Sequence, residues 1–301
     1  FKGDAVNMDV VTDMDSINSR KREAQEYLGS ISMGGALTPE DFSTELVRGF
    51  FGTGKVDDKV VMQYLKNSKS KDIHSLKMNK DKTGFDVKGD DISKLSATLG
   101  EEGLNKLYDK MGVKQGDSDA LAKAISSSGF KGIEAIKEAV GGAGAVVSAE
   151  GDNFNIAGSK AVDEATKTLE FDAQLEQARR LTGKADFGSG AENTEEGRAK
   201  LKNETNEDFK NNPRRMIELA QNAEKMAFSG QDYDTLQAQM KNDPTLAKTL
   251  KAQEDQLRAD GLAGKGNFFG SLSGVNEDKI KEANSLGKVR QRLEGESGGN
   301  K

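Results

Sequence analysis

Narrow apolar stripes at helical spacing, interrupted by glycines, limit the folds open to this chain more than any other feature of its sequence. The clearest stripe follows Pro213 at intervals suited to one side of a helix and consists of Met216, Leu219, Ala220, Ala223, Met226 and Ala227. Such a helix buries a thin strip of surface and leaves its other sides polar. Helices of this kind pack in pairs or against a partner more readily than around one broad core. The pattern predicts a mainly α protein of elongated or multi-segment helical bundles.

The supply of core-forming residues is small for the length of the chain. Leu, Ile, Val and Phe together number 61 of 301 residues, about 20%, which is the boundary at which a chain struggles to fill a core. The 34 glycines add joints but no side chains to bury. We therefore expect no single large domain, and a stability that is low or divided among segments.

Start and stop signals predict the order of the elements. Thr38-Pro39-Glu40-Asp41 combines a capping Thr, a first-turn Pro and an acid three residues after the cap, which is typical of a helix start. Two short segments that alternate apolar and polar residues, 85–89 and 154–158, predict short β segments. Further helices are predicted at 56–67, 91–110, 117–127, 130–140 and 159–182, and from about residues 213, 243 and 277 onward.

A glycine- and acid-rich stretch suggests how the chain is divided. Residues 183–197 contain mostly Gly, Glu, Asn, Ser and Ala, which cannot bury enough apolar surface to offset the entropy of ordering. They are predicted to form a flexible, protease-sensitive linker. An N-terminal helical region with the short β segments, 1–182, precedes it, and a C-terminal helical region, 198–301, follows it.

Composition excludes several kinds of chemistry. The chain has no cysteine and a single histidine, His74, so disulfide scaffolds, Cys-zinc sites, thiol nucleophiles and histidine relays are excluded. The 44 basic and 50 acidic residues are evenly mixed, which gives no strong nucleic-acid signal. The longest apolar run, 139–147, is far shorter than the roughly 20 residues of a transmembrane helix. We expect no cofactor, no metal and no transmembrane segment.

Two loops resemble ligand-binding motifs only in part. Gly49–Lys55 has the spacing of a phosphate loop, but a helix precedes it and Val56 stands where Ser or Thr would bind magnesium. We expect its glycines to end that helix. Residues 79–90 have calcium-loop spacing, but they begin with Asn79 and carry Asp86 where an apolar residue belongs. A solvated turn is the favoured interpretation.

Other isolated signals favour structural roles. His74 has no Ser or Cys nucleophile at a suggestive spacing, so a surface or half-buried structural histidine is expected. The basic pairs at 179–180 and 214–215 are flanked by acids, which favours solvated helix faces over phosphate clamps.

The last residues carry the one motif that points to a reaction. The sequence Leu-Glu-Gly-Glu-Ser-Gly-Gly-Asn at 293–300 directly follows an amphipathic helix. It resembles the opening motif of the lytic transglycosylase and goose-type lysozyme-like family, in which a helix ends in Glu-Ser-Gly-Gly-Asn. The resemblance implies that Glu296 is a general acid that protonates the glycosidic oxygen of peptidoglycan, with Ser297 as its neighbour. It covers eight residues, and the rest of such a domain would lie beyond Lys301. A polar, glycine-rich tail is the alternative.

These features favour a structural protein over a complete enzyme. The leading hypothesis is an internal virion protein of a bacteriophage, ejected with DNA and leading into a peptidoglycan-degrading domain. Its location would be the virion, in the capsid interior or the portal and tail region. Its partners would be other virion proteins or its own copies in a homo-oligomer, with peptidoglycan as a further contact. The start at Phe1 suggests a cut precursor or part of a longer polypeptide.

The alternative hypothesis is a scaffold or binding module of a bacterial secretion or conjugation apparatus, located in the cell envelope. In either case, the 301 residues assemble no complete catalytic set, and we expect them to be inactive by themselves.

Overall fold

The computed structural model describes residues 39–141, 144–225, 231–263 and 275–298. Most of them are helical and the rest include one small sheet, which confirms the mainly α prediction. The chain forms two compact units. We call residues 53–171 the inserted unit, because in sequence they interrupt the other, and we call residues 39–52 with 172–298 the helical unit.

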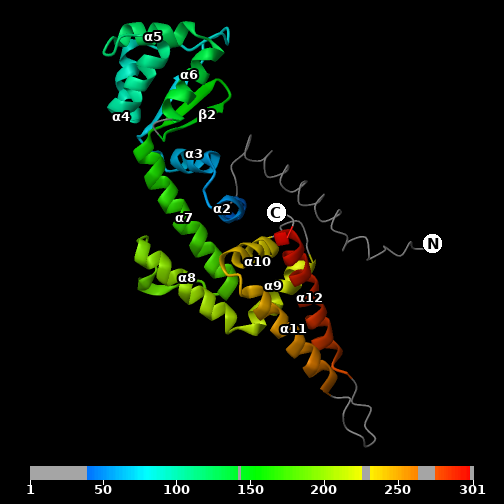
Figure 1. Ribbon diagram of the computed structural model, residues 1–301. Coiled ribbons are helices and arrows are strands. Elements are labelled where there is room, and N and C mark those ends of the chain that lie inside the picture. Colours follow the sequence, from blue (N-terminus) through cyan, green and yellow to red (C-terminus); the bar gives the residue numbers. More distant parts are fainter. Residues whose placement is uncertain (1–38, 142–143, 226–230, 264–274, 299–301) are drawn as a thin grey trace, which may run out of the picture. The chain divides into compact units, whose positions relative to one another are not determined.

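The inserted unit combines helices with a three-stranded antiparallel sheet of order β1-β3-β2 (Figure 1). In the sheet register, Ile73 of β1 and Val146 of β2 both lie opposite Ala157 of β3. Its elements are α3 (Asp58–Asn67), β1 (Ile73–Lys77), α4 (Gly89–Met111), α5 (Ser118–Ser127), α6 (Phe130–Gly141), β2 (Val146–Glu150), β3 (Asn153–Ala157) and the first half of α7 (Ser159–Thr182).

The core of the inserted unit lies between one face of the sheet and helices α4, α5 and α6. On β1, His74 and Leu76 are buried whereas Ser75 and Lys77 are exposed, as the period of two in a strand requires. The rest of the core is almost entirely apolar; its largest fully buried side chains are Tyr108, Phe85, Ile92, Leu95, Leu107, Leu121, Ile125, Ile136 and Ile156.

Glycines allow two unusual features where α4 meets α7. Gly100 has φ 73° and ψ 175°, a conformation nearly restricted to glycine, and it kinks α4 near its middle. Gly158 precedes α7, and a Cβ atom at this position would lie 1.7 Å from the carbonyl oxygen of Thr98. The chain can enter α7 along this path because residue 158 has no side chain.

The prediction of a short strand at 85–89 was wrong. Within that segment only Phe85 pairs, through an isolated bridge to Met78, because the chain reverses in a tight turn between them. The neighbouring strand β1, which the sequence pattern did not predict, forms instead. The polar His74 at an inward position hides its apolar alternation. The prediction at 154–158 is confirmed by β3.

The helical unit contains only helices among its described elements. Helices α11 and α12 lie side by side (Figure 1), and α12 also contacts α9 and α10. The apolar stripe predicted after Pro213 is buried in its core at Met216, Leu219, Ala220 and Ala223, whereas its last two members, Met226 and Ala227, lie outside the described residues. Its elements are α2 (Pro39–Thr53), the second half of α7, the short 3-10 helix η2 (Gly188–Gly190), α8 (Glu195–Lys210), α9 (Pro213–Lys225), α10 (Gln231–Asn242), α11 (Leu246–Leu262) and α12 (Glu277–Gly298).

Helix α2 joins this unit from the other side of the inserted sequence. It begins at Pro39, as the start signal predicted, and buries Leu46 and Val47. The guanidinium of Arg48 donates hydrogen bonds from Nε (3.2 Å) and from a terminal nitrogen (2.9 Å) to Oδ2 of Asp234 on α10. Segments 186 residues apart therefore meet in one unit.

The predicted linker, residues 183–197, lies within the helical unit. Gly183, with φ 71°, follows α7, and α8 begins at Glu195. The two units divide instead at residues 52/53 and 171/172. The protease sensitivity of 183–197 stays a prediction.

Candidate functional site

The candidate acid Glu296 lies in the last turn of α12, which ends at Gly298. Its side chain is outside the described residues. The preceding turns are fixed in the core of the helical unit, where α12 buries Ala283, Leu286, Val289 and Leu293. The backbone of Glu296 therefore continues a helix that is packed up to Leu293.

An ionic cluster lies one to two turns before Glu296. Glu254 on α11 has a relative exposure of 6%, and its Oε2 accepts a hydrogen bond from Nε of Arg290 on α12 at 3.1 Å. Its Oε1 accepts another from Arg258 at 3.0 Å. A terminal nitrogen of Arg290 also donates to Glu294, one turn further along α12. The cluster links the C-terminal part of α12 to α11.

These contacts further favour the charged form of Arg290. Burial favours the neutral form, but the hydrogen bonds and charges of Glu294 and Glu254 outweigh it, so the pKa of Arg290 lies above its ordinary value. Two further contacts hold the other sides of α12: Lys288 pairs with Glu224 of α9 at 2.8 Å, and the guanidinium of Arg292 lies 5.1 Å from the ring centre of Tyr233 on α10.

Gly49–Lys55 does not form a phosphate loop. Residues up to Thr53 belong to α2, Gly54 follows with φ 70°, and Lys55 is exposed. A phosphate loop requires a strand before its glycines and a helix after its lysine. The expectation that the motif ends a helix is confirmed at Gly54, although Gly49 and Gly52 lie inside α2.

Residues 79–84 form the turn that was favoured over a calcium loop. A strand precedes them instead of a helix, and Oδ1 of Asn79 accepts a hydrogen bond from the backbone N–H of Thr83 at 3.0 Å. The ammonium of Lys82 lies 3.1 Å from a carboxylate oxygen of Asp152. In a calcium loop, Oδ1 of Asn79 would be the ligand at the first position. Here that oxygen closes the turn instead.

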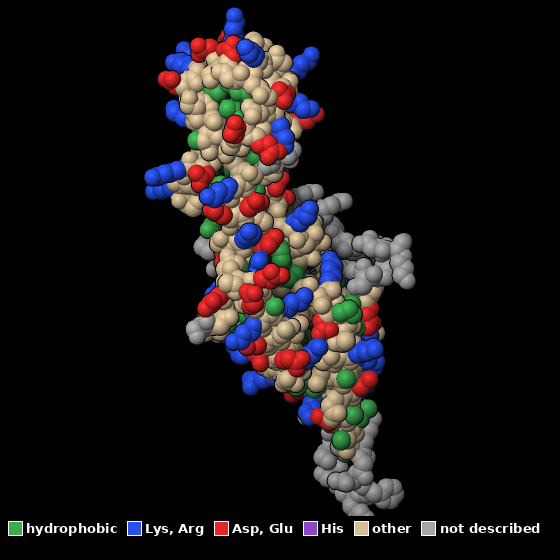
Figure 2. All heavy atoms as spheres, turned by 60° about the vertical axis from the view of Figure 1, so that its left-hand side comes forward, with side chains coloured by type: hydrophobic (Ala, Val, Ile, Leu, Met, Phe, Trp, Pro, Cys, Tyr) green, Lys and Arg blue, Asp and Glu red, His purple; other side chains and the backbone are tan. Residues whose placement is uncertain are grey.

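The basic pairs are engaged in helix contacts. Arg179 and Arg180 both face Glu176, at 3.9 and 3.0 Å. Arg215 donates from Nε to the carbonyl oxygen of Arg180 at 3.0 Å, near the end of α7, and Arg214 pairs with Glu218. Figure 2 shows basic and acidic side chains interspersed over the face in view. Arg179 and Arg214 are exposed, as expected for solvated helix faces. For Arg180 and Arg215 that expectation was wrong, because both are largely buried in contacts between helices.

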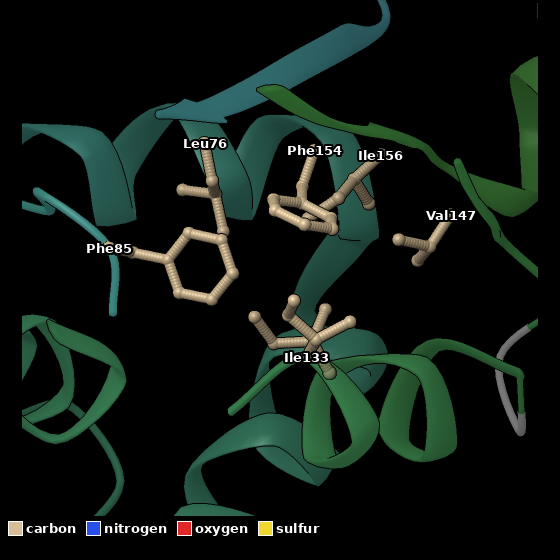
Figure 3. A pocket seen from close by; sticks show the side chains of 7 residues that line it. Leu76, Phe85, Ile133, Val147, Phe154 and Ile156 are labelled. Atoms are coloured by element: carbon tan, nitrogen blue, oxygen red, sulfur yellow. The ribbon is translucent and has the colours of Figure 1, made fainter. Parts of the chain in front are cut away.

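The apolar space in the inserted unit is packed core. Its lining side chains converge from the sheet, α6 and the turn after β1 (Figure 3): Leu76, Phe85, Ile133, Ile136, Val147, Phe154 and Ile156. The rings of Phe85 and Phe154 meet edge to face with centres 5.0 Å apart. The space between these side chains leaves no room for a water molecule. It is not a preformed ligand pocket.

Among the residues that the structure describes, no group of three or more His, Asp or Glu side chains could hold a metal ion. Over the same ranges, every helix is too short or too polar to cross a bilayer. Comparisons with protein-family models, curated proteins and solved structures find no match to this chain. The resemblance at residues 293–300 therefore stays a prediction.

Sequence reasoning missed the cluster around Glu254. The spacing of Arg290 and Glu294, four residues apart on one helix, was a readable signal. No local signal connects either residue to Glu254, which lies 36 positions from Arg290 and reaches it only through the pairing of α11 with α12.

Proposed function

We propose that this chain is an internal structural protein of a bacteriophage particle, ejected with DNA and leading into a peptidoglycan-degrading domain. The observation that carries the proposal is the form of α12: one continuous helix from Glu277 to Gly298 that places Glu296 in its last turn. In the family that the motif resembles, the catalytic glutamate is also held at the end of such a helix.

The packing of α12 suits this role. Leu293, the last buried residue among the side chains of α12 that the structure describes, lies three positions before Glu296, and Arg290 links the same stretch to Glu254. A general acid must be held within hydrogen-bond reach of the glycosidic oxygen, and its pKa must be raised by an apolar cleft. In this proposal the helical unit supplies the rigid base, and sequence beyond Lys301 supplies the cleft and the sugar-binding surface.

The division into two units supports the structural and ejected part of the proposal. Each unit has its own apolar core, and α7 contributes residues to both. A protein that passes through a narrow conduit must unfold at least in part. Units with separate cores can open one at a time, at a lower free-energy cost than one large core.

The proposed partners and location follow from the same reasoning. The chain would reside in the capsid interior or the portal and tail region, in contact with its own copies or other virion proteins. Quantitative mass spectrometry of purified particles tests this: we expect a fixed copy number above one per particle. Its absence from particles, with recovery in an envelope fraction, would instead support a scaffold of a secretion or conjugation apparatus.

A zymogram on peptidoglycan tests the role of Glu296. It compares the 301-residue chain, the longer natural product, and Glu296→Gln and Glu277→Gln variants of that product. Glutamine keeps the shape of the side chain but cannot donate the proton. We expect lysis by the longer product and by its Glu277→Gln variant, which is a control at the exposed start of α12. We expect no lysis by the 301-residue chain or by the Glu296→Gln variant.

Lysis by the 301-residue chain, or by Glu296→Gln, would remove Glu296 from the mechanism. A natural product that ends at Lys301 would remove the peptidoglycan-degrading part of the proposal.

A further inference from the structure

The one histidine of the chain is enclosed in the inserted unit. His74 lies on β1 on the same side as Leu76, facing the core, with a relative exposure of 9%. Its Nε2 atom is buried and has no hydrogen-bond partner among the residues that the structure describes. A buried polar atom without a partner is uncommon and costs free energy. The cost becomes much larger if the ring takes up a proton, because Nε2 then bears hydrogen and the ring carries a charge.

The surroundings of His74 cannot easily accommodate that charge. Its register partner on the neighbouring strand, Ile156 of β3, is apolar, and so is Val147 of β2, which pairs with Ile156 from the other side. The charged groups that act on the ring come from α4 and are Asp91 and Lys94.

Asp91 is already engaged by other partners. Its Oδ2 accepts the backbone N–H of Lys88 at 3.0 Å, and its Oδ1 lies 3.7 Å from the ammonium of Lys94. It can therefore offset only part of a new charge on the imidazole, and Lys94 opposes that charge directly.

We propose that His74 makes the inserted unit acid-sensitive: protonation of the buried ring loosens the contact of β1 with α4 at mildly acidic pH and leaves the helical unit intact. The protonated imidazole is hydrated only if β1 and α4 separate, so the proton favours the open form. This response to pH requires no ligand. Protonation of His74 acts on a unit that can open separately from the rest of the chain.

The sign of the effect follows from linkage. Burial lowers the pKa of His74 below its ordinary value of 6.5; Asp91 raises it in part and Lys94 lowers it further. The folded unit thus binds the proton more weakly than the unfolded chain. Stability of the inserted unit falls as pH drops through the ordinary histidine range, and this loss stops once pH is below the lowered pKa of the folded form.

The first test uses the full, unaltered chain. With histidine labelled with carbon-13, NMR gives a single imidazole signal because the chain has one histidine. We expect this signal to titrate with a midpoint clearly below 6.5. A midpoint at or above 6.5 would overturn the proposal.

The second test is hydrogen exchange at pH 7.5 and 5.5, corrected for the intrinsic rates. We expect protection of the 73–77 and 89–99 segments to fall several-fold at the lower pH, up to about tenfold for each pH unit over which only the open form binds the proton. The segment 283–293 of α12 serves as the internal control and should keep its protection.

The matched variant is His74→Phe, which fills similar space with a ring that cannot ionise. It should show no selective loss of protection in the inserted unit between the two pH values. An equal loss in the variant, or an equal loss in α12, would overturn the proposal. Because the NMR titration needs no variant, the proposal stays testable even if His74→Phe does not fold.

Discussion

Both units of this protein have an apolar core, but partly buried pairs of charged or amide side chains join distant segments of the helical unit. The inserted unit is continuous in sequence, and its helices and sheet enclose aliphatic and aromatic side chains such as Leu95 and Phe85. The helical unit is assembled from segments on both sides of that insertion, and polar pairs lie between its helices. These pairs are Arg48 with Asp234, Gln177 with Gln239, and Arg290 with Glu254.

The comparison shows two ways to specify a fold from few core-forming residues. Apolar contacts have no direction, so a continuous segment can use them with short connections and a low entropic cost of loop closure. A helix that must pair with a segment far away in sequence can instead pair with other helices of the chain, because their apolar stripes are similar. Hydrogen-bonded pairs at set positions favour one pairing over the others, because a wrong pairing leaves buried polar groups without partners.

The largest expected effects come from cavities in the two cores. Leu107→Ala in the inserted unit and Leu219→Ala in the helical unit each truncate a fully buried side chain. Each should destabilise its own unit by about 3–5 kcal/mol. Calorimetry with hydrogen exchange should show that each variant lowers one transition and leaves the other in place. If either substitution shifts both units together, they do not unfold separately.

The ion pair of the helical unit should have the next largest effect. Arg290→Met removes one of the two arginine partners of Glu254 and leaves it with Arg258. We expect a loss of about 2 kcal/mol in that unit, below the range for fully enclosed pairs. Both side chains retain about a tenth of their exposure, 11% for Arg290 and 9% for Glu254. Denaturant unfolding followed by circular dichroism measures the loss.

The double variant Arg290→Met with Glu254→Leu serves as the control. It removes the buried charge together with its partner and should recover most of the stability. No recovery would mean that Arg290 acts through packing and not through its pairing with Glu254.

Alanine substitutions at two glycines inside helices should have the smallest effects on stability, and the effects should be opposite in sign. Gly100→Ala forces a side chain into the glycine conformation at the α4 kink and should destabilise the inserted unit by about 1–2 kcal/mol. Gly295→Ala adds a methyl group in α12 with no atom within 4 Å and should stabilise the helical unit by up to about 1 kcal/mol. Melting temperatures of the two variants should move in opposite directions, and a decrease in both would contradict the conformational argument.

Most helices could be predicted because their signals are local. The helix predicted at 159–182 has the same bounds as α7, and the predicted starts at Pro39 and near Glu277 agree with α2 and α12. A cap, a first-turn proline and a stripe of three- and four-residue spacing all act within a few residues of each other, so no distant contact is needed to interpret them.

The strands were predicted less well because their pairing is not local. β1 has an inward histidine that breaks the apolar alternation, and it is held by β3, some 80 positions later in the chain. Phe85 has the local pattern of a strand residue. It follows the turn that Asn79 closes, and its side chain packs in the core instead of belonging to a strand. The position of Glu296 on a helix end was predictable from the preceding stripe. The cluster that anchors that helix was not.

Local sequence patterns establish that this protein is helical, that its helices carry narrow apolar stripes, and that its one histidine is His74. Those properties depend on residue type and short spacing. The packing of the folded chain, in contrast, makes residues 53–171 interrupt a second unit, encloses Nε2 of His74 without a partner among the described residues, and brings Glu254 to Arg290. Each of these depends on which distant segments pack together, and many similar amphipathic stripes leave that choice open until side chains interlock and buried polar groups find partners.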